Sequence, residues 1–281
     1  MPCPVVYQTI GSSAYRDRPC HRPEHRPSTA RDRPCHRPEQ RLSVALDRLS
    51  HRPQHRPSVA LDRLFHSQLT ALHPVGQDGA VTHYEDSLVE VHRVVVGPMD
   101  NNVHVVRCRQ SGEAVLIDAA NEHERLLDLC RTLGVRRVVE THGHWDHIQA
   151  VPAVRDAGLD VAVTAADAGM LPAYDQILED DQILAVGRLR IRTIATPGHT
   201  PGSICFAVEG TPLLFSGDTL FPGGPGNTSF PGGDFAAIID SLDRRLFAAF
   251  DDTTLVLPGH GADTTIGAER PHLAEWAARG W

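Results

Sequence analysis

The segment that most constrains this chain is ETHGHWDHI, residues 140–148, which places three histidines and an aspartate within six positions. It follows an apolar run, Val135–Glu140, that is predicted to be a β-strand. One histidine in a loop is usually a plain surface residue, but four ionisable side chains this close together indicate a common target. The fold must therefore present this loop from the end of a strand, where α/β folds tend to place their sites.

Three later segments repeat the same arrangement, in which an apolar strand runs into glycine and then presents one ionisable residue. These segments are TPGHTPGS with His199, FSGDTLF with Asp218 and LPGHGAD with His260. Glycine lets the backbone turn sharply beside the side chain that the strand delivers. With the first segment, the candidate metal ligands are His142, His144, Asp146, His147, His199, Asp218 and His260.

Five imidazoles and two carboxylates suit divalent first-row cations, with zinc expected and iron or manganese as alternatives. Seven ligands are too many for one tetrahedral ion. The set therefore predicts two ions, about 3.5–4 Å apart and bridged by a carboxylate.

The motif HGHWDH, followed by the isolated His199, Asp218 and His260, resembles the metallo-β-lactamase fold superfamily over roughly residues 85–281. The resemblance implies a four-layer αββα sandwich with the site at the edge between its two sheets. Independently of it, strands outnumber helices, and hairpins mix with crossover helices. That pattern predicts an α/β (α+β) chain with two sheets and helices on their outer faces.

The resemblance also implies a role for each residue. It assigns one metal to His142, His144 and His199, the other to Asp146, His147 and His260, the bridge to Asp218, a supporting role to Asp118, and orientation of the nucleophile to Asp146.

Within the superfamily, Trp145 and the segments SGDTLFPGGPGNTSFPGGD and PGHGADTTIGAER are similar to glyoxalase II and its relatives. This similarity implies hydrolysis of small acyl thioesters, such as hydroxyacyl-glutathione, by attack of a metal-bound hydroxide on the carbonyl. Two features depart from the pattern. Asn227 stands where many relatives have a basic residue for the glutathione carboxylate, and the chain has no long helical segment after His260. We therefore expect a small-molecule substrate with a different thiol carrier.

Two other classes of function stay open from the sequence. The chain also resembles the persulfide dioxygenases, mononuclear iron oxidoreductases on the same fold that retain similar motifs. A binding protein with a relic site is the third reading, but the complete set of ligands argues against it.

The N-terminal part of the chain is built from 15-residue copies, at 16–30, 31–45 and 46–60, that are rich in arginine, proline and histidine. Residues 1–75 hold twelve arginines and six acids, although the whole chain carries a formal net charge of −8. Little apolar surface is available there to offset chain entropy, so residues 1–80 are predicted to be a disordered arm before a catalytic domain at 81–281. No aromatic residues alternate with the repeat arginines, so we expect no nucleic-acid partner.

Bulk features exclude some other classes of protein. No apolar run is long enough to cross a membrane or to act as a signal peptide. The six cysteines form no CxxC pair and are expected to be reduced thiols, which favours a cytoplasmic protein. The sequence does not indicate an oligomeric state.

Three local expectations can be compared with the structure. The stretch Asn121–Glu124 looks like a helix start with a reciprocal acidic partner, and Gly134 looks like its end. The acidic segment 171–184 looks like a connection without regular structure. His104 lies in a β-rich stretch and is expected on the surface of a strand.

Overall fold

The computed structural model describes residues 81–280, so the predicted repeat arm at 1–80 lies outside the described residues. Within this range the larger of two sheets has seven strands, antiparallel from β1 to β4 and parallel from β4 to β7. In spatial order they are β1 (Val81–Glu85), β2 (Val89–Val96), β3 (Asn101–Cys108), β4 (Ala114–Ile117), β5 (Val135–Val139), β6 (Asp160–Thr164) and β7 (Gln176–Leu178).

The second sheet has six strands, and its neighbours are antiparallel except for the parallel pair β11 and β14. In spatial order they are β15 (Thr264–Thr265), β14 (Leu255–Pro258), β11 (Leu213–Gly217), β10 (Ile204–Val208), β9 (Leu189–Ala195) and β8 (Ile183–Val186). A short ribbon, β12 (Leu220–Phe221) with β13 (Gly224–Pro225), follows β11.

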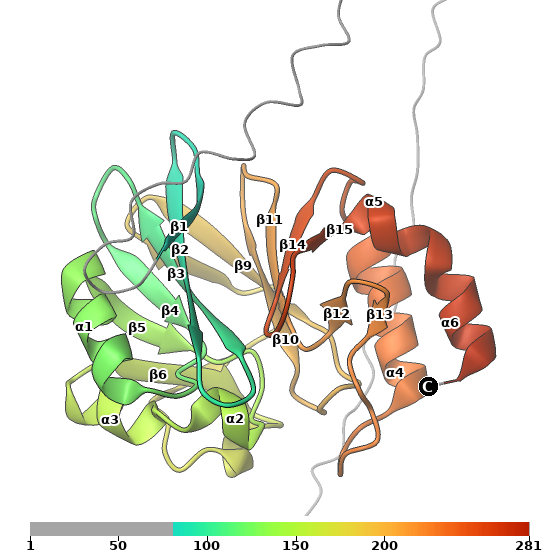
Figure 1. Cartoon of the computed structure of the whole chain (residues 1–281), viewed down its shortest axis with the longest axis horizontal. Coiled ribbons are helices and arrows are strands. Elements are labelled where there is room, and N and C mark those ends of the chain that lie inside the picture. Colours follow the sequence, from blue (N-terminus) through green and yellow to red (C-terminus); the bar gives the residue numbers. More distant parts are fainter. Residues whose placement is uncertain (1–80, 281) are drawn as a thin grey trace, which may run out of the picture. The chain divides into compact units, whose positions relative to one another are not determined.

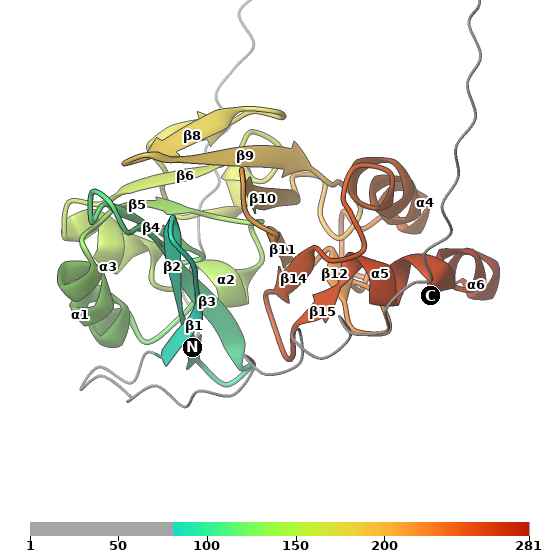
Figure 2. The same ribbon diagram turned by 90° about the horizontal axis from the view of Figure 1, so that it is seen from above.

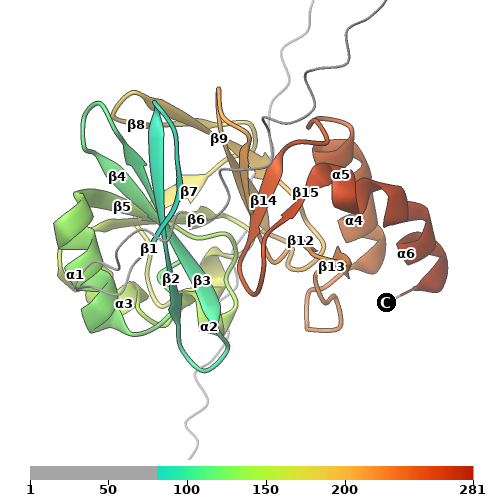
Figure 3. The ribbon, with the colours of Figure 1, turned by 45° about the horizontal axis from the view of Figure 1, so that its top comes forward.

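Helices lie on the outer sides of the two sheets, with α1 and α3 beside the first sheet and α4 and α6 beside the second (Figures 1 and 3). The helices are α1 (His123–Leu133), α2 (Trp145–Ile148), α3 (Val151–Asp156), η1 (Ala168–Met170), α4 (Phe235–Asp240), the π-helical η2 (Ser241–Phe247), α5 (Ile266–Glu269), η3 (Arg270–His272) and α6 (Leu273–Arg279). None of the described helices is long and apolar enough to cross a membrane.

Three apolar clusters separate the four layers. The first lies between sheet one and its helices, where Leu126 of α1 and Val154 of α3 are fully buried. The second lies between the sheets, with Val106 of β3 and Phe206 of β10, and Figure 2 shows the sheets side by side. The third places Leu242 of η2 beneath sheet two. This is the expected αββα sandwich, and the fold prediction is confirmed.

The first helix begins within the predicted stretch and ends at Gly134 as predicted, but the predicted reciprocal capping contact is wrong. Helix α1 begins at His123 after Glu122, whose backbone is left-handed with φ 49° and whose side chain makes no cap hydrogen bond. The Glu122 carboxylate accepts instead from the Gly97 N–H at 2.9 Å, so a tertiary contact replaces the local cap. Gly134 ends α1 with φ 76°, the conformation that glycine adopts most easily.

Two other expectations also need correction. The acidic segment 171–184 holds β7 and β8, which carry the chain from the edge of the first sheet to the edge of the second. Such short edge strands have too few residues for a clear alternating pattern. His104 is 2% exposed, because β3 is covered on both faces, and its ring packs edge-on against Phe215 at 5.2 Å between centroids.

Candidate metal centre

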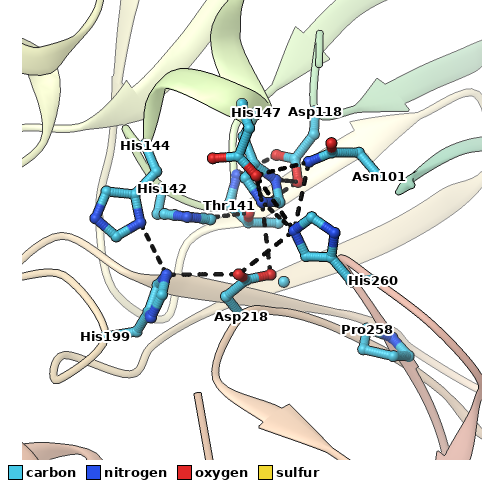
Figure 4. A network of polar contacts seen from close by, with 12 residues as sticks. Asn101, Asp118, Thr141, His142, His144, His147, His199, Asp218, Pro258 and His260 are labelled. Carbon is cyan, nitrogen blue, oxygen red and sulfur yellow. Dashed lines mark hydrogen bonds and ion pairs between the residues drawn. The ribbon is translucent and has the colours of Figure 1, made fainter. Parts of the chain in front are cut away.

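All seven candidate ligands lie together at one edge of the sandwich, where loops after β5, β9, β11 and β14 meet (Figure 4). The β5 loop carries His142 and His144, and the first turn of α2 then presents Asp146 and His147. Strands from both sheets thus contribute, which brings together residues more than a hundred positions apart.

The first ligand cluster consists of His142, His144 and His199, each with one ring nitrogen within 4.8 Å of the others. His144 Nδ1 lies 2.9 Å from His199 Nε2. The second cluster consists of Asp146, His147 and His260. His260 Nε2 lies 3.2 Å from His147 Nε2 and 3.3 Å from Asp146 Oδ2. These clusters have the same members as the two groups that the resemblance implied.

Asp218 lies between the two clusters (Figure 4). Its Oδ2 is 3.5 Å from His199 Nε2 in the first cluster and 3.6 Å from His260 Nε2 in the second. Its Oδ1 is 3.5 Å from His147 Nε2. One carboxylate therefore faces both clusters, as a bridging ligand must.

The outer nitrogens of four of these histidines are fixed by hydrogen bonds to the protein. His199 Nδ1–H donates to the Asn227 carbonyl at 2.7 Å, and His260 Nδ1–H donates to the Met99 carbonyl at 2.8 Å. A carbonyl oxygen can only accept, so the proton of each neutral ring is on Nδ1. The Nε2 atoms that face the centre therefore present lone pairs, as metal ligands do.

The other two outer nitrogens lead to Asp118. His147 Nδ1–H donates to Asp118 Oδ2 at 2.9 Å. The Thr141 hydroxyl donates to the same oxygen at 2.9 Å, so it accepts from His142 Nδ1–H at 3.0 Å. Asp118 is held with φ 65°, which is unusual for a residue other than glycine. Its observed place is the supporting one that the resemblance implied.

The ligand atoms that face the middle of the centre require a positive charge between them. The Nε2 lone pairs of His147 and His260 face each other at 3.2 Å, an arrangement that neutral rings would avoid. The buried atoms His142 Nε2 and Asp218 Oδ1 have no hydrogen-bond partner in the described part of the chain. Nitrogen and carboxylate donors in this arrangement fit zinc, iron or manganese. The residues present therefore fit the group that the sequence predicts.

Protonation equilibria in the centre point the same way. Burial lowers the pKa of His142 well below its ordinary value, and His147 and His199 nearby lower it further. Burial also opposes protonation of His147, but the carboxylates of Asp218 and Asp118 outweigh burial and hold its pKa well above its ordinary value. The carboxylates thus favour a cation at the position that His147 Nε2 faces.

Asp167 is a buried residue of the centre that sequence reasoning missed. Its Oδ2 accepts from the Gly143 N–H at 2.9 Å and from the Thr200 hydroxyl at 2.6 Å, and its Oδ1 accepts from the Gly202 N–H at 2.8 Å. Gly143 lies between two ligands of the first cluster, and Thr200 follows His199. Asp167 therefore ties together the two loops that form the first cluster.

Two asparagines at the start of β3 serve the second cluster in a similar way. Asn101 Nδ2 donates to Asp146 Oδ2 at 3.0 Å. Asn102 Nδ2 donates to the carbonyls of Pro258 and Gly261, both at 3.0 Å, and so holds the loop that carries His260. No local sequence signal marks these residues, because their partners lie more than 40 positions away.

Gly259 shows why glycine precedes a ligand. A Cβ atom at this position would lie 2.4 Å from Asp218 Oδ1 and 2.8 Å from His147 Cε1. Any side chain would therefore displace two ligands of the centre.

Glu140 is a second buried carboxyl behind the centre, with no exposed surface. Burial raises its pKa well above the ordinary value, and the neighbouring Asp118 raises it further. Both of its oxygens lie near the Ala119 N–H, at 3.2 and 3.3 Å. Glu140 thus adds little negative charge to that of Asp118, which holds His147.

This chain is similar to several known proteins. The family model described as the metallo-beta-lactamase superfamily matches residues 96–260. A curated relative, the hydroxyacylglutathione hydrolase of Rhodospirillum rubrum, is 34% identical over 177 residues, covering 62% of this chain and 67% of the relative.

Two solved structures are also similar. The BLEG-1 B3 metallo-beta-lactamase is 29% identical with a TM-score of 0.59, covering 65% of this chain and 97% of that protein. The protein TTHA1623, solved in a di-iron-bound form, is 32% identical with a TM-score of 0.57, covering 63% of this chain and 96% of that protein.

Proposed function

The chain belongs to the metallo-beta-lactamase superfamily, and we propose that it is a hydrolase of small acyl thioesters that uses two divalent metal ions. The observation that carries the proposal is the position of Asp218 between two complete three-residue clusters. A single-ion site would leave three of these buried or half-buried ligands without a purpose and at a desolvation cost.

Two bound cations supply a Lewis acid for the carbonyl and lower the pKa of water toward neutrality. The chain's own residues then orient the reactants. Asn101 fixes Asp146, so the Asp146 carboxylate is held in place to orient the attacking water. Asp118 holds His147 in one tautomer. A thiolate leaving group has a free-thiol pKa of about 8.5 and so needs little help from a general acid.

Thioesters are favoured as substrates by the hydroxyacylglutathione hydrolase among the relatives. The glutathione carrier is less well supported, because the Asn227 side chain is exposed and accepts from the Ser229 N–H at 2.8 Å. We propose that the enzyme acts on acyl thioesters without a strong preference for glutathione.

Asn227→Arg tests the role of this position. Arginine would offer a bidentate charged donor to the glutathione carboxylate, so the variant should lower KM for lactoyl-glutathione with little change in kcat. Steady-state kinetics of both proteins, with a thioester lacking the glutamyl carboxylate as control, checks the result. A wild-type preference for the glutathione compound of a hundredfold, about 2.7 kcal/mol, would contradict the proposal.

The test of the function itself joins metal analysis to a substrate panel. We expect two metal ions per chain in protein purified without added metal, and thiol release from lactoyl-glutathione and from acetyl-N-acetylcysteamine. A β-lactam belongs in the panel because a β-lactamase is among the similar structures. Two metals with β-lactam cleavage and no thiol release would reject the thioesterase proposal.

An iron-dependent oxidoreductase of the persulfide dioxygenase type is the second candidate. The di-iron-bound form of TTHA1623 favours iron as the metal, although that protein holds two ions and this candidate requires one. One iron per chain, with oxygen uptake in the presence of a persulfide, would support this candidate over the hydrolase.

A further inference from the structure

Four residues that contact ligand-bearing loops or adjoin a ligand in sequence have large, exposed apolar side chains. They are Met99, 52% exposed, Trp145, 59% exposed, Met170, 40% exposed, and Phe230, 52% exposed. Three other large apolar residues in the described range are also exposed, namely Leu88, Val95 and Tyr174. We call the four residues the apolar rim. Exposed apolar side chains next to a site offer a surface that a ligand can cover.

Contacts fix two members of the apolar rim against the first ligand cluster. The Phe230 ring meets the His144 ring edge-on, with 5.5 Å between centroids. Met170 packs on Gly143, where an added Cβ would lie 2.7 Å from Met170 Cβ and 3.0 Å from its sulfur. Both side chains therefore border the centre from loops other than the one that carries His144.

The other two members adjoin ligands through the backbone. The Met99 carbonyl accepts from His260 Nδ1–H, so the Met99 backbone is tied to a ligand. Trp145 stands in the sequence between His144 and Asp146, at the first position of α2. The apolar rim thus draws on the loops of both clusters.

Positive side chains are missing from the same loops. The chain contains no lysine, and no arginine occurs in the segments that carry ligands or rim residues, which are 97–101, 142–149, 165–175, 196–203, 218–234 and 259–263. A carrier with two carboxylates would find no cationic side chain in these segments to pair with. Carboxylates that lose their hydration without a partner are costly.

We propose that the apolar rim selects thioesters with an apolar acyl group on an uncharged thiol carrier. This inference rests on the proposed hydrolase and names its substrate class. Binding an apolar group against Phe230 and Met170 removes apolar surface of both partners from water, and this burial drives the selection. The polar contacts of the substrate are then made by its carbonyl group at the metal centre.

Four thioethers that cannot be hydrolysed test the proposal by binding to the metal-loaded, full-length protein. They combine S-methyl or S-benzyl with glutathione or with N-acetylcysteamine. We expect S-benzyl to bind at least about tenfold more tightly than S-methyl on both carriers, and N-acetylcysteamine to bind as tightly as glutathione or more so. A benzyl-to-methyl ratio near one, or a tenfold preference for glutathione, would overturn the proposal.

The variant Phe230→Ala tests whether the preference for S-benzyl over S-methyl arises at the apolar rim. This variant should reduce the benzyl-to-methyl ratio at least threefold while two metal ions per chain are retained. Val95→Ala, which shortens an exposed apolar residue of β2, is the matched control and should leave the ratio unchanged. An unchanged ratio in Phe230→Ala would show that the apolar rim does not determine the preference for an apolar group.

Hydrolysis is measured separately, so the two ideas can fail independently. Rim-dependent binding without thiol release from the matching acetyl and phenylacetyl thioesters would reject the hydrolase but keep the binding preference. Release of thiol from all thioesters at equal kcat/KM, with equal thioether binding, would keep the hydrolase and reject the preference.

Discussion

Each histidine of the centre has two ring nitrogens, and the structure gives them different tasks. The outer nitrogens of His199 and His260 donate to carbonyls, which leaves the inner nitrogens as lone pairs. Asp118 does the same for His147 with a carboxylate. Partners of this kind raise the basicity of a ligand and fix the direction of its lone pair. At the scale of single residues, the histidine lone pairs are therefore already oriented to bind cations.

Asp218→Ala is expected to reduce activity more than His260→Ala. Asp218 faces both clusters, so its removal should weaken the binding of both ions, whereas His260 belongs to one cluster. We expect a loss in kcat/KM of at least a thousandfold, about 4 kcal/mol, for Asp218→Ala. Metal stoichiometry and turnover of both variants, measured side by side, check this order.

Asp218→Asn serves as a control of nearly equal shape that removes only the charge. It should resemble Asp218→Ala in metal content if the bridging charge is what matters. A fully active Asp218→Ala protein with two metal ions would contradict the dinuclear assignment.

At the scale of elements, strands provide the position and loops provide the ligands. Strands β5, β9, β11 and β14 end at the same edge of the sandwich, and each is held in a sheet by its neighbours. The loops that follow them are tied to one another by buried side chains such as Asp167 and Asn102. The precision of the centre thus depends on residues that are not ligands.

Asp167→Asn should weaken the first ligand cluster selectively. Asparagine has only one acceptor oxygen, so it cannot accept from the N–H groups of both Gly143 and Gly202. We expect a ten- to hundredfold loss of affinity for one of the two metal ions, as supporting partners of metal ligands typically contribute. Metal titration of the metal-free protein, followed by two-site analysis, measures this.

The control for Asp167→Asn is Asp175→Asn, a substitution of the same kind in the same loop at an exposed ion pair with Arg155. It should leave both metal affinities unchanged. Equal loss of both ions in Asp167→Asn, or no loss, would show that Asp167 does not act through the first cluster.

At the scale of the whole molecule, the space between the two sheets contains a buried histidine, His104, whose pKa is lowered. Burial, together with the nearby His83 and Arg93, lowers the pKa of His104 to about 3, against an opposing effect of Asp263. In the unfolded chain His104 takes up a proton near pH 6.5. The unfolded state therefore binds more protons between about pH 6.5 and pH 3, and stability falls as the pH falls through this window.

His104→Leu should flatten this dependence. The difference in unfolding free energy between wild type and variant is expected to change by up to about 1.4 kcal/mol per pH unit below pH 6.5. Denaturant unfolding of the metal-free proteins at pH 7.5 and pH 5.5 measures it, since the other titrating groups are shared by both proteins. Parallel pH profiles for the two proteins would show that His104 is not the cause.

Deletion of residues 1–75 is expected to leave folding and metal content intact. All seven candidate ligands and every described strand lie at or after residue 81. Circular dichroism and metal analysis of the truncated and full-length chains make the comparison. An insoluble or metal-free truncated protein would show that the arm contributes to the domain.

The sequence by itself determined the identities of the candidate ligands and the strands that deliver them, because each ligand lies within a few residues of an apolar run. The pattern of elements also predicted two sheets with helices on their outer faces, and the resemblance implied the αββα sandwich. Only the tertiary structure decided what surrounds the ligands. Asp167 meets Gly143 and Gly202 across 24 and 35 positions, and Asn101 meets Asp146 across 45. His104 is buried because β3 is covered on both faces, and the apolar rim gathers from loops of both sheets. Such contacts depend on how sheets and loops pack against each other. The spacing of residues within one segment does not reveal this packing.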